Sequence, residues 1–197
     1  MEAGGVEAAI QEAILSDHFP VSFQMAEDEL TTTADEMRPR ALMVHLSRQS
    51  YLPLVFEQIR EHFADAIPPL AQAGQMWCSC EESGVPLRWH HPCGVLFDAH
   101  GSQQQLPWGV VVHFTKFPHQ ELLNLQRSSA REDVQWHFMN TMKEAIFLQY
   151  GSTQPLTSLG MEQQAALWSA LLAEDACKFA DAAAPLSRGT NSDNNPR

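Results

Sequence analysis

The sequence has few basic residues and no long apolar run. Its 197 residues include 12 Lys and Arg against 24 Asp and Glu, which gives a formal charge of −12. The field of such a chain opposes nucleic acid and anionic lipid, so neither is an expected partner. No segment approaches the roughly 18 to 20 consecutive apolar residues that a bilayer helix needs. We therefore expect membrane association only through a protein complex.

The N-terminus lacks the common targeting signals. No basic region precedes an apolar segment, as a secretory signal requires, and Glu2 occupies the position where N-myristoylation requires glycine. The expected location is the cytoplasm.

Cysteine is scarce and unevenly spaced. Cys78, Cys80, Cys93 and Cys177 are too few for the disulfide framework of a secreted protein. Residues 90–93, His-His-Pro-Cys, follow the Cys-x-Cys pair closely, so a small zinc-binding module is one alternative, although zinc knuckles use Cys-x2-Cys. The favoured interpretation is buried strand thiols, with no metal and no cofactor.

Alternating apolar residues predict short strands in the first part of the chain. Residues 19–25 and 42–46 have a period of two and predict a hairpin. Residues 76–81 and 85–90 predict a second hairpin, and residues 110–115 predict a further strand.

One helix is predicted among these strands. Apolar residues recur at steps of three and four over residues 52–67, and Pro68 and Pro69 end the pattern. Strands arranged around one packed helix predict an α+β fold, for which a ubiquitin-like β-grasp sheet is the economical solution.

The second part of the chain has helical periodicity. Residues 133–150 predict a helix that ends at Gly151, and residues 162–179 predict another. The predicted organisation is an N-terminal extension at 1–18, a β-grasp domain at 19–126, a partial helix-rich region at 127–180 and a disordered tail at 181–197.

Lys143 lies within an apolar stripe of the first of these helices. Its nearest apolar neighbours, all within about 60° on the helical wheel, are Trp136, Met139, Ile146, Phe147 and Tyr150. In one interpretation the lysine methylenes pack on this stripe and the ammonium reaches water. In the other, the amine is a nucleophile, because apolar surroundings disfavour its charged form. Glu144 points about 100° away and is a poor candidate for its base.

No enzyme motif accompanies this lysine, and we expect no catalytic residue. The sequence has no Gly-rich phosphate loop, no G-x-S-x-G and no H-E-x-x-H. A thiol-dependent conjugating transferase that uses Cys93 is an alternative, since Pro92 and Cys93 open a candidate short helix whose N-terminus would favour a thiolate.

Several motifs resemble a known family. Residues 84–98 read GVPLRWHHPCGVLFD, and LPW and VHF follow at 106–108 and 112–114. Residues 137–145 read HFMNTMKEA, with SYLPL at 50–54 and LW at 167–168. From about residue 19 to about residue 179, the sequence resembles the autophagy protein 5 family.

The resemblance implies a first ubiquitin-like domain and a helix-rich middle region, without the family's second ubiquitin-like domain. It implies a non-catalytic scaffold to which the modifier autophagy protein 12 is joined by an isopeptide bond; by motif match the acceptor is Lys143. Implied partners are the pathway's conjugating enzymes and the coiled-coil protein autophagy protein 16, whose groove is built partly from the second ubiquitin-like domain.

The implied conjugate acts like a ubiquitin ligase. It promotes transfer of the autophagosomal ubiquitin-like protein to phosphatidylethanolamine at the phagophore assembly site membrane. The apolar stripe around Lys143 would then be a docking or packing surface around the acceptor amine, an inference that comes from the helical wheel.

Overall fold

The computed structural model describes residues 17–30, 38–71, 74–101 and 105–188. The chain forms two compact units that divide after Val134. Each unit is described by itself. Of the predicted N-terminal extension, only residues 17 and 18 lie within the described residues, and His18 already belongs to the first strand.

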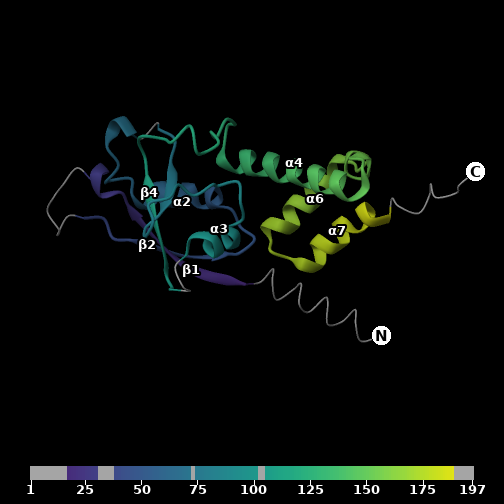
Figure 1. Ribbon diagram of the computed structural model, residues 1–197, viewed down its shortest axis with the longest axis horizontal. Helices are drawn as coiled ribbons and strands as arrows, with labels where there is room; N and C mark the ends of the chain where they lie inside the picture. Colours follow the sequence, from purple (N-terminus) through teal and green to yellow (C-terminus); the bar gives the residue numbers. More distant parts are fainter. Residues whose placement is uncertain (1–16, 31–37, 72–73, 102–104, 189–197) are drawn as a thin grey trace, which may run out of the picture. The chain divides into compact units, whose positions relative to one another are not determined.

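The first unit is built on a four-stranded mixed sheet (Figure 1). The strands are β1 His18–Met25, β2 Leu42–Ser47, β3 Trp77–Cys80 and β4 Trp108–His113, in the order β2-β1-β4-β3. β1 and β2 are antiparallel, which confirms the predicted hairpin, whereas β1 and β4 are parallel. The α+β class and the ubiquitin-like sheet are therefore confirmed.

The predicted helix at 52–67 is shorter than its apolar pattern. It begins as the 3-10 helix η3 Leu52–Val55, continues as α2 Phe56–His62 and ends five residues early. Beyond the regular helix, the N–H of Ile67 still donates to the carbonyl of Phe63 at 3.0 Å. An isolated turn thus keeps the helical spacing of core residues beyond the regular helix.

The predicted hairpin of 76–81 with 85–90 is confirmed only as a short antiparallel contact, because the second segment forms no regular strand. β3 pairs along its length with β4, and the 85–90 segment makes an isolated bridge between Pro86 and Ser79. Two backbone bonds flank this bridge, from Cys80 N–H to Val85 at 3.0 Å and from Leu87 N–H to Cys78 at 2.8 Å. Pro86 lies between these two bonds, at a position whose N–H would point away from β3, so proline is tolerated there.

Short helices complete the sheet unit. They are η1 Glu27–Glu29, η4 Pro69–Ala71 and α3 Cys93–His100. The candidate short helix at Cys93 is thereby confirmed.

The second unit is helical, and its first helix begins before the division. The helices are α4 Ala130–Tyr150, α5 Gln154–Thr157, α6 Met161–Leu172 and α7 Ala176–Arg188. The single helix predicted at 162–179 is two helices, because Glu174 has a φ of 55° and Asp175 then accepts the N–H of Lys178 at 2.9 Å. A new helix starts at that acceptor.

The disorder predicted from residue 181 is wrong over 181–188, which belong to α7. Leu186 is buried there, and α7 is amphipathic along its length, because small alanines supply much of its apolar face. Residues 189–197 of the predicted tail lie outside the described residues.

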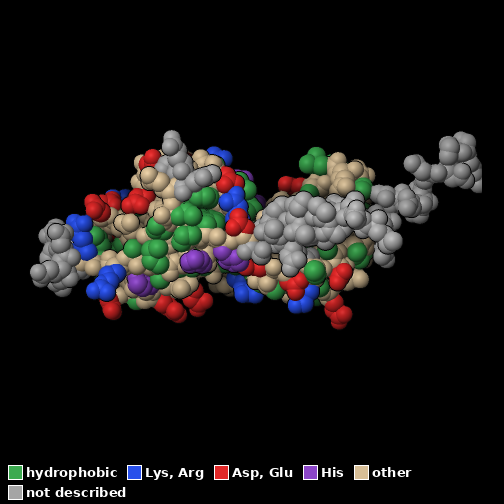
Figure 2. All heavy atoms as spheres, turned by 90° about the horizontal axis from the view of Figure 1, so that it is seen from below, with side chains coloured by type: hydrophobic (Ala, Val, Ile, Leu, Met, Phe, Trp, Pro, Cys, Tyr) green, Lys and Arg blue, Asp and Glu red, His purple; other side chains and the backbone are tan. Residues whose placement is uncertain are grey.

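Charged side chains of both signs are distributed over the face drawn in Figure 2, with acidic groups on both units. Among the helices of the described residues, none has the length and apolar character to cross a bilayer.

Candidate functional site

α4 holds Lys143 on a helix that is fixed at both ends. At the start, the side chain of Ser129 accepts the N–H of Glu132 at 3.2 Å. At the end, Gly151 has a φ of 72° and donates its N–H to Phe147 at 2.7 Å. The predicted helix end at Gly151 is confirmed, since glycine enters this left-handed conformation without strain.

Asp133 ties the preceding loop to the first turn of α4. Its carboxylate is buried and accepts the backbone N–H groups of Gln126 and Arg127, each at 3.1 Å. A carboxylate in the first turn also stabilises the positive end of the helix dipole.

One face of α4 is covered by its own unit. Phe138 and Ile146 are buried, and the Phe138 ring lies 5.8 Å from the ring of Trp168 in α6. Ile146 therefore belongs to the packed face of the helix. The sequence placed it in a possible docking or packing surface around Lys143, and its burial gives it the packing role, because about 60° of rotation from Lys143 brings a side chain to the edge of the buried face.

The other face carries the lysine and exposed apolar side chains. Trp136 and Phe147 are 55% and 54% exposed, whereas Met139 and Tyr150 are half-buried. Lys143 itself is half-buried. We call this set, Lys143 with Trp136, Met139, Phe147 and Tyr150, the acceptor face.

An open hollow of about 470 Å³ adjoins Lys143 at the C-terminal end of the helix. It is lined by Lys143, Glu144, Phe147, Leu148 and Thr153. Leu148 is 84% exposed, and the helical wheel missed it because it lies about 140° from Lys143. The turn at Gly151 returns the chain so that Thr153 closes the hollow, a tertiary feature that no periodicity encodes.

The three lysines of the chain all lie within the described residues and have different surroundings. Lys116 pairs with Asp28 at 2.8 Å, and Lys178 pairs with Asp175 at 2.9 Å. Lys143 has no ion pair or hydrogen bond within the described part of the chain, even with Glu144 in the same hollow.

These pairings affect how readily each amine loses its proton. The hydrogen bond that Lys116 donates to Asp28, and then the negative charge of Asp28, raise the pKa of Lys116. Asp175 raises the pKa of Lys178 in the same way. A raised pKa keeps an amine protonated and hence unable to attack an acyl group.

Cys93 lies in surroundings that oppose thiol catalysis. It is the first residue of α3, yet it has no exposed surface, and its N–H bonds to the carbonyl of Ser50 at 2.7 Å. Burial raises the pKa of Cys93 to about 12. Desolvation therefore outweighs the helix N-terminus, and the thiolate that a transferase needs is disfavoured.

The sequence also placed thiols and histidines close enough to consider zinc. Within the residues that the structure describes, no group of three or more His, Cys, Asp or Glu side chains is arranged to hold a metal ion. The Cys80 thiol instead donates to the carbonyl of His100 at 3.3 Å.

Histidine in β4 has a structural role. His113 bonds to the Ser79 hydroxyl at 2.8 Å and stacks on Trp77 with ring centroids 3.8 Å apart. The imidazole therefore holds β4 to β3 through one hydrogen bond and one ring contact.

Two family models match the chain. The model of the autophagy protein ATG5 UblA domain matches residues 14–114, and the model of the autophagy protein ATG5 alpha-helical bundle region matches residues 131–188. The predicted end of the resemblance, near Phe179, is therefore nine residues early when compared with the end of the second model at 188.

Curated relatives and a solved structure agree with these models. Autophagy protein 5 of Drosophila melanogaster is 32% identical over 160 residues, which are 81% of this chain and 56% of the relative. Autophagy protein 5 of Oryza sativa subsp. japonica is 31% identical over 153 residues, which are 78% of this chain and 38% of the relative. The chain thus spans about half or less of the length of these two relatives.

The crystal structure of Kluyveromyces marxianus Atg5 has the same fold. Its TM-score is 0.79 at 20% identity, and the match covers 90% of this chain and 68% of that one.

Proposed function

Because the chain belongs to the autophagy protein 5 family, we propose that it serves in autophagy as a non-catalytic acceptor for a ubiquitin-like modifier, autophagy protein 12. The acceptor atom in this proposal is Nζ of Lys143. The observation that carries the assignment is that Lys143 differs from the chain's two other lysines, whose ammonium groups are each held by an aspartate.

The proposed reaction joins Lys143 to the C-terminal glycine of the modifier. A thioester on a conjugating enzyme supplies the activated acyl group. The neutral amine attacks the thioester carbon, the C–S bond breaks as the C–N bond forms, and the enzyme's thiol leaves. The nitrogen loses one proton, which balances the proton that the departing thiolate takes up, and the product is an isopeptide bond that keeps one N–H.

The acceptor face supplies a surface against which the modifier or the conjugating enzyme could be held. Phe147 and Leu148 expose apolar area beside the amine, and Trp136 exposes more on the same helix. Burial of such area in a complex positions the amine near the thioester and reduces the entropic cost of the reaction.

Reconstitution with purified modifier, activating enzyme and conjugating enzyme tests the acceptor. We expect wild-type chain to gain one covalent adduct of the modifier's mass, and Lys143→Arg to gain none. Lys116→Arg and Lys178→Arg are matched controls and should be modified at the wild-type rate. If Lys143→Arg were modified equally, or if either control lost the adduct, the assignment would be wrong.

We further propose that the conjugate reaches the phagophore assembly site membrane through its partners, where it promotes lipidation of the autophagosomal ubiquitin-like protein. The charge of −12 supports recruitment by proteins over direct attraction to anionic lipid. Autophagy protein 16 is the proposed coiled-coil partner. Native mass of the purified chain with and without the partner's helix tests this contact, and an unchanged mass would refute binding by this chain.

A further inference from the structure

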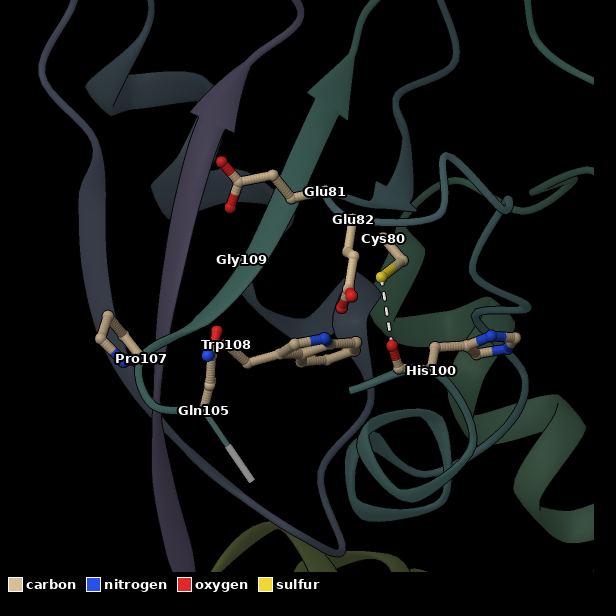
Figure 3. Close-up of a pocket in the computed structure, with 8 residues that line it drawn as sticks. All are labelled: Cys80, Glu81, Glu82, His100, Gln105, Pro107, Trp108 and Gly109. Carbon is tan, nitrogen blue, oxygen red and sulfur yellow. Dashed lines mark hydrogen bonds between the residues drawn. The ribbon is translucent and has the colours of Figure 1, made fainter. Parts of the chain in front are cut away.

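The sheet has two edge strands, β2 and β3, and among the described residues only β3 is covered along its outer edge. The segment at 85–87 bonds to β3 at 2.8 and 3.0 Å. Figure 3 shows the end of this strand, where the Cys80 thiol donates to the carbonyl of His100 and two glutamates follow. A covering segment and charged residues are both devices that keep a strand edge from pairing with another chain.

β2 has a row of unpaired backbone groups on its outer edge. The N–H of Arg48 donates to the carbonyl of Asp17 at 3.0 Å. Pro20 of β1, which has no N–H, lies opposite His45. Because hydrogen-bonded pairs alternate along an antiparallel ladder, the even-numbered residues of β2 bond to β1, and Met43 and His45 direct their N–H and C=O groups away from it. No hydrogen bond to these groups is found in the part of the chain that the structure describes.

Apolar side chains flank this edge on both faces of the sheet. Leu42 and Val44 face the core but are only half-buried. Met43 lies on the opposite face, as the alternation of a strand requires, and is 54% exposed. The strand contains no proline, lysine, aspartate or glutamate that would oppose pairing. An added strand would therefore gain apolar contacts as well as backbone hydrogen bonds.

The edge is basic, although the chain as a whole is acidic. Residues 38–48 contain three arginines and one histidine but no Asp or Glu, and the next acidic residue is Glu57. Two of the arginines pair with acidic side chains. Arg40 is exposed and has no ion pair in the described ranges. Salt screens charges beyond about 8 Å, so an added strand meets this local charge more strongly than the distant acidic groups.

The same charges oppose a second copy of this chain on the edge. In an antiparallel pair of two β2 strands that uses the outward groups of both, Met43 of one copy lies opposite His45 of the other. This register brings Arg40 toward Arg48 of the second copy. Like charges that face each other across a ladder are destabilising. An acidic strand would meet the opposite, favourable condition.

We propose that the free edge of β2 binds an extended acidic segment of a partner protein as an additional strand. The backbone groups of Met43 and His45 would form the ladder, and an acidic side chain of the segment would lie near Arg40. β-branched residues between the acidic ones would suit the strand conformation. The inference does not use Lys143 or the acceptor face, so it can fail while the proposed acceptor function holds.

Two synthetic peptides test the charge preference of the 197-residue chain. The acidic probe is N-acetyl-Asp-Val-Thr-Val-Thr-Asp-amide, and the basic probe has lysine in place of both aspartates. Amide resonances of the chain labelled with ¹⁵N follow each titration. We expect the acidic probe to bind with a Kd on the order of 1 mM, because a short flexible peptide loses entropy on binding, and the basic probe to bind about tenfold more weakly.

Hydrogen exchange distinguishes strand addition from simple charge attraction. In the free chain, the amides of Met43 and His45 should exchange rapidly and that of Val44 slowly, because only Val44 donates to β1. When the acidic probe is present at ten times its Kd, about one eleventh of the chain remains free. Exchange at Met43 and His45 should then slow by about tenfold.

Charge variants test the position of the acidic side chain. Arg40→Glu should weaken the acidic probe by about fivefold and strengthen the basic probe. Arg88→Glu makes the same charge change at an exposed position in the segment beside β3 and should leave both Kd values unchanged. Because Arg40 is exposed and unpaired in the described structure, its substitution leaves the core intact.

Three outcomes would overturn the proposal. Exchange at Met43 and His45 could remain unchanged at 10 times the acidic probe's expected Kd of about 1 mM. The acidic and basic probes could bind equally well. Both amides could already be protected without peptide, which would mean that a second copy or another segment of this chain occupies the edge; a doubled native mass would identify the second copy.

Discussion

Glu29 joins the short helix η1 to the end of β4, and its removal is a quantitative test of the sheet unit. Glu29 is only 8% exposed, and its carboxylate accepts three hydrogen bonds. The donors are Phe114 N–H at 2.7 Å, Thr115 N–H at 3.0 Å and the Thr115 hydroxyl at 2.6 Å.

Glu29→Ala should lower the free energy of unfolding of the sheet unit by about 3 kcal/mol. The N–H of Phe114 would be left buried without an acceptor, which costs about 2 kcal/mol. The two Thr115 donors reach water more easily and add about 1 kcal/mol each. Relief of the buried carboxylate's desolvation offsets about 1 kcal/mol of this sum.

Urea titration followed by the indole N–H peaks of Trp89 and Trp108 measures this change, because both tryptophans belong to the sheet unit. Glu27→Ala is the matched control in the same helix. Glu27 pairs with Arg38 at 3.2 Å on an exposed surface, so its loss should cost less than about 1 kcal/mol. Equal effects of the two substitutions would refute the buried-carboxylate argument.

Four further measurements follow from burial. At pH 8 a thiol reagent should label exposed Cys177 rapidly and Cys93 only after unfolding, because burial raises the pKa of Cys93 to about 12; rapid native labelling of Cys93 would contradict this. For the same reason the folded state retains the thiol proton that the unfolded chain loses as the pH rises. The contribution of Cys93 to the free energy of unfolding should therefore fall by about 2 kcal/mol between about pH 8 and 10, and Cys93→Ala should remove this contribution. Burial lowers the pKa of His113, so stability should also fall as the pH drops below about 6.5, and His113→Gln should flatten this fall. Ile146→Ala should lower the free energy of unfolding by about 3 kcal/mol. Phe147→Ala should lower it by less than about 1 kcal/mol and should instead slow formation of the adduct. Equal losses of stability would place Phe147 in the core.

The strands could be predicted from sequence because a half-buried strand places alternate residues in the core. Val21 and Phe23 of β1, and Val110 and Val112 of β4, are fully buried, as their period of two requires. The pairing partner of each strand could not be predicted in this way. Alternation is the same in any pairing, so it could not show that β3 pairs with β4 and leaves the 85–90 segment at a single bridge.

The ends of the helices were harder to predict, because the conformation of a single residue can end a helix. Glu174 adopts a left-handed φ of 55°, a conformation that an ordinary non-glycine residue rarely enters. The Ala-rich sequence on either side has high helix propensity and favours one continuous helix. The break between α6 and α7 is therefore a consequence of tertiary packing that overrides local preference.

The site was predictable where it depends on one helix and unpredictable where it depends on contacts across the chain. The wheel of α4 grouped Trp136 and Phe147 with Lys143, and both side chains are more than half exposed in the structure. Leu148 joins the same hollow because the chain turns back after Gly151, and the wheel of a single helix contains no such return.

The chemical distinction of Lys143 also comes from pairings at two different sequence distances. Asp175 lies three residues before Lys178, so that ion pair is visible as a helical i,i+3 spacing. Asp28 lies 88 residues from Lys116 and reaches it only because β1 runs parallel to β4. Without the fold, neither Lys116 nor Lys143 has an acidic residue at a helical spacing of three or four, as Lys178 has. The parallel strand pair occupies Lys116 with a carboxylate, and Lys143 is thereby left as the lysine without a carboxylate partner in the described residues. The difference between Lys143 and the two paired lysines is in this way a property of the folded sheet as much as of the helix that carries Lys143.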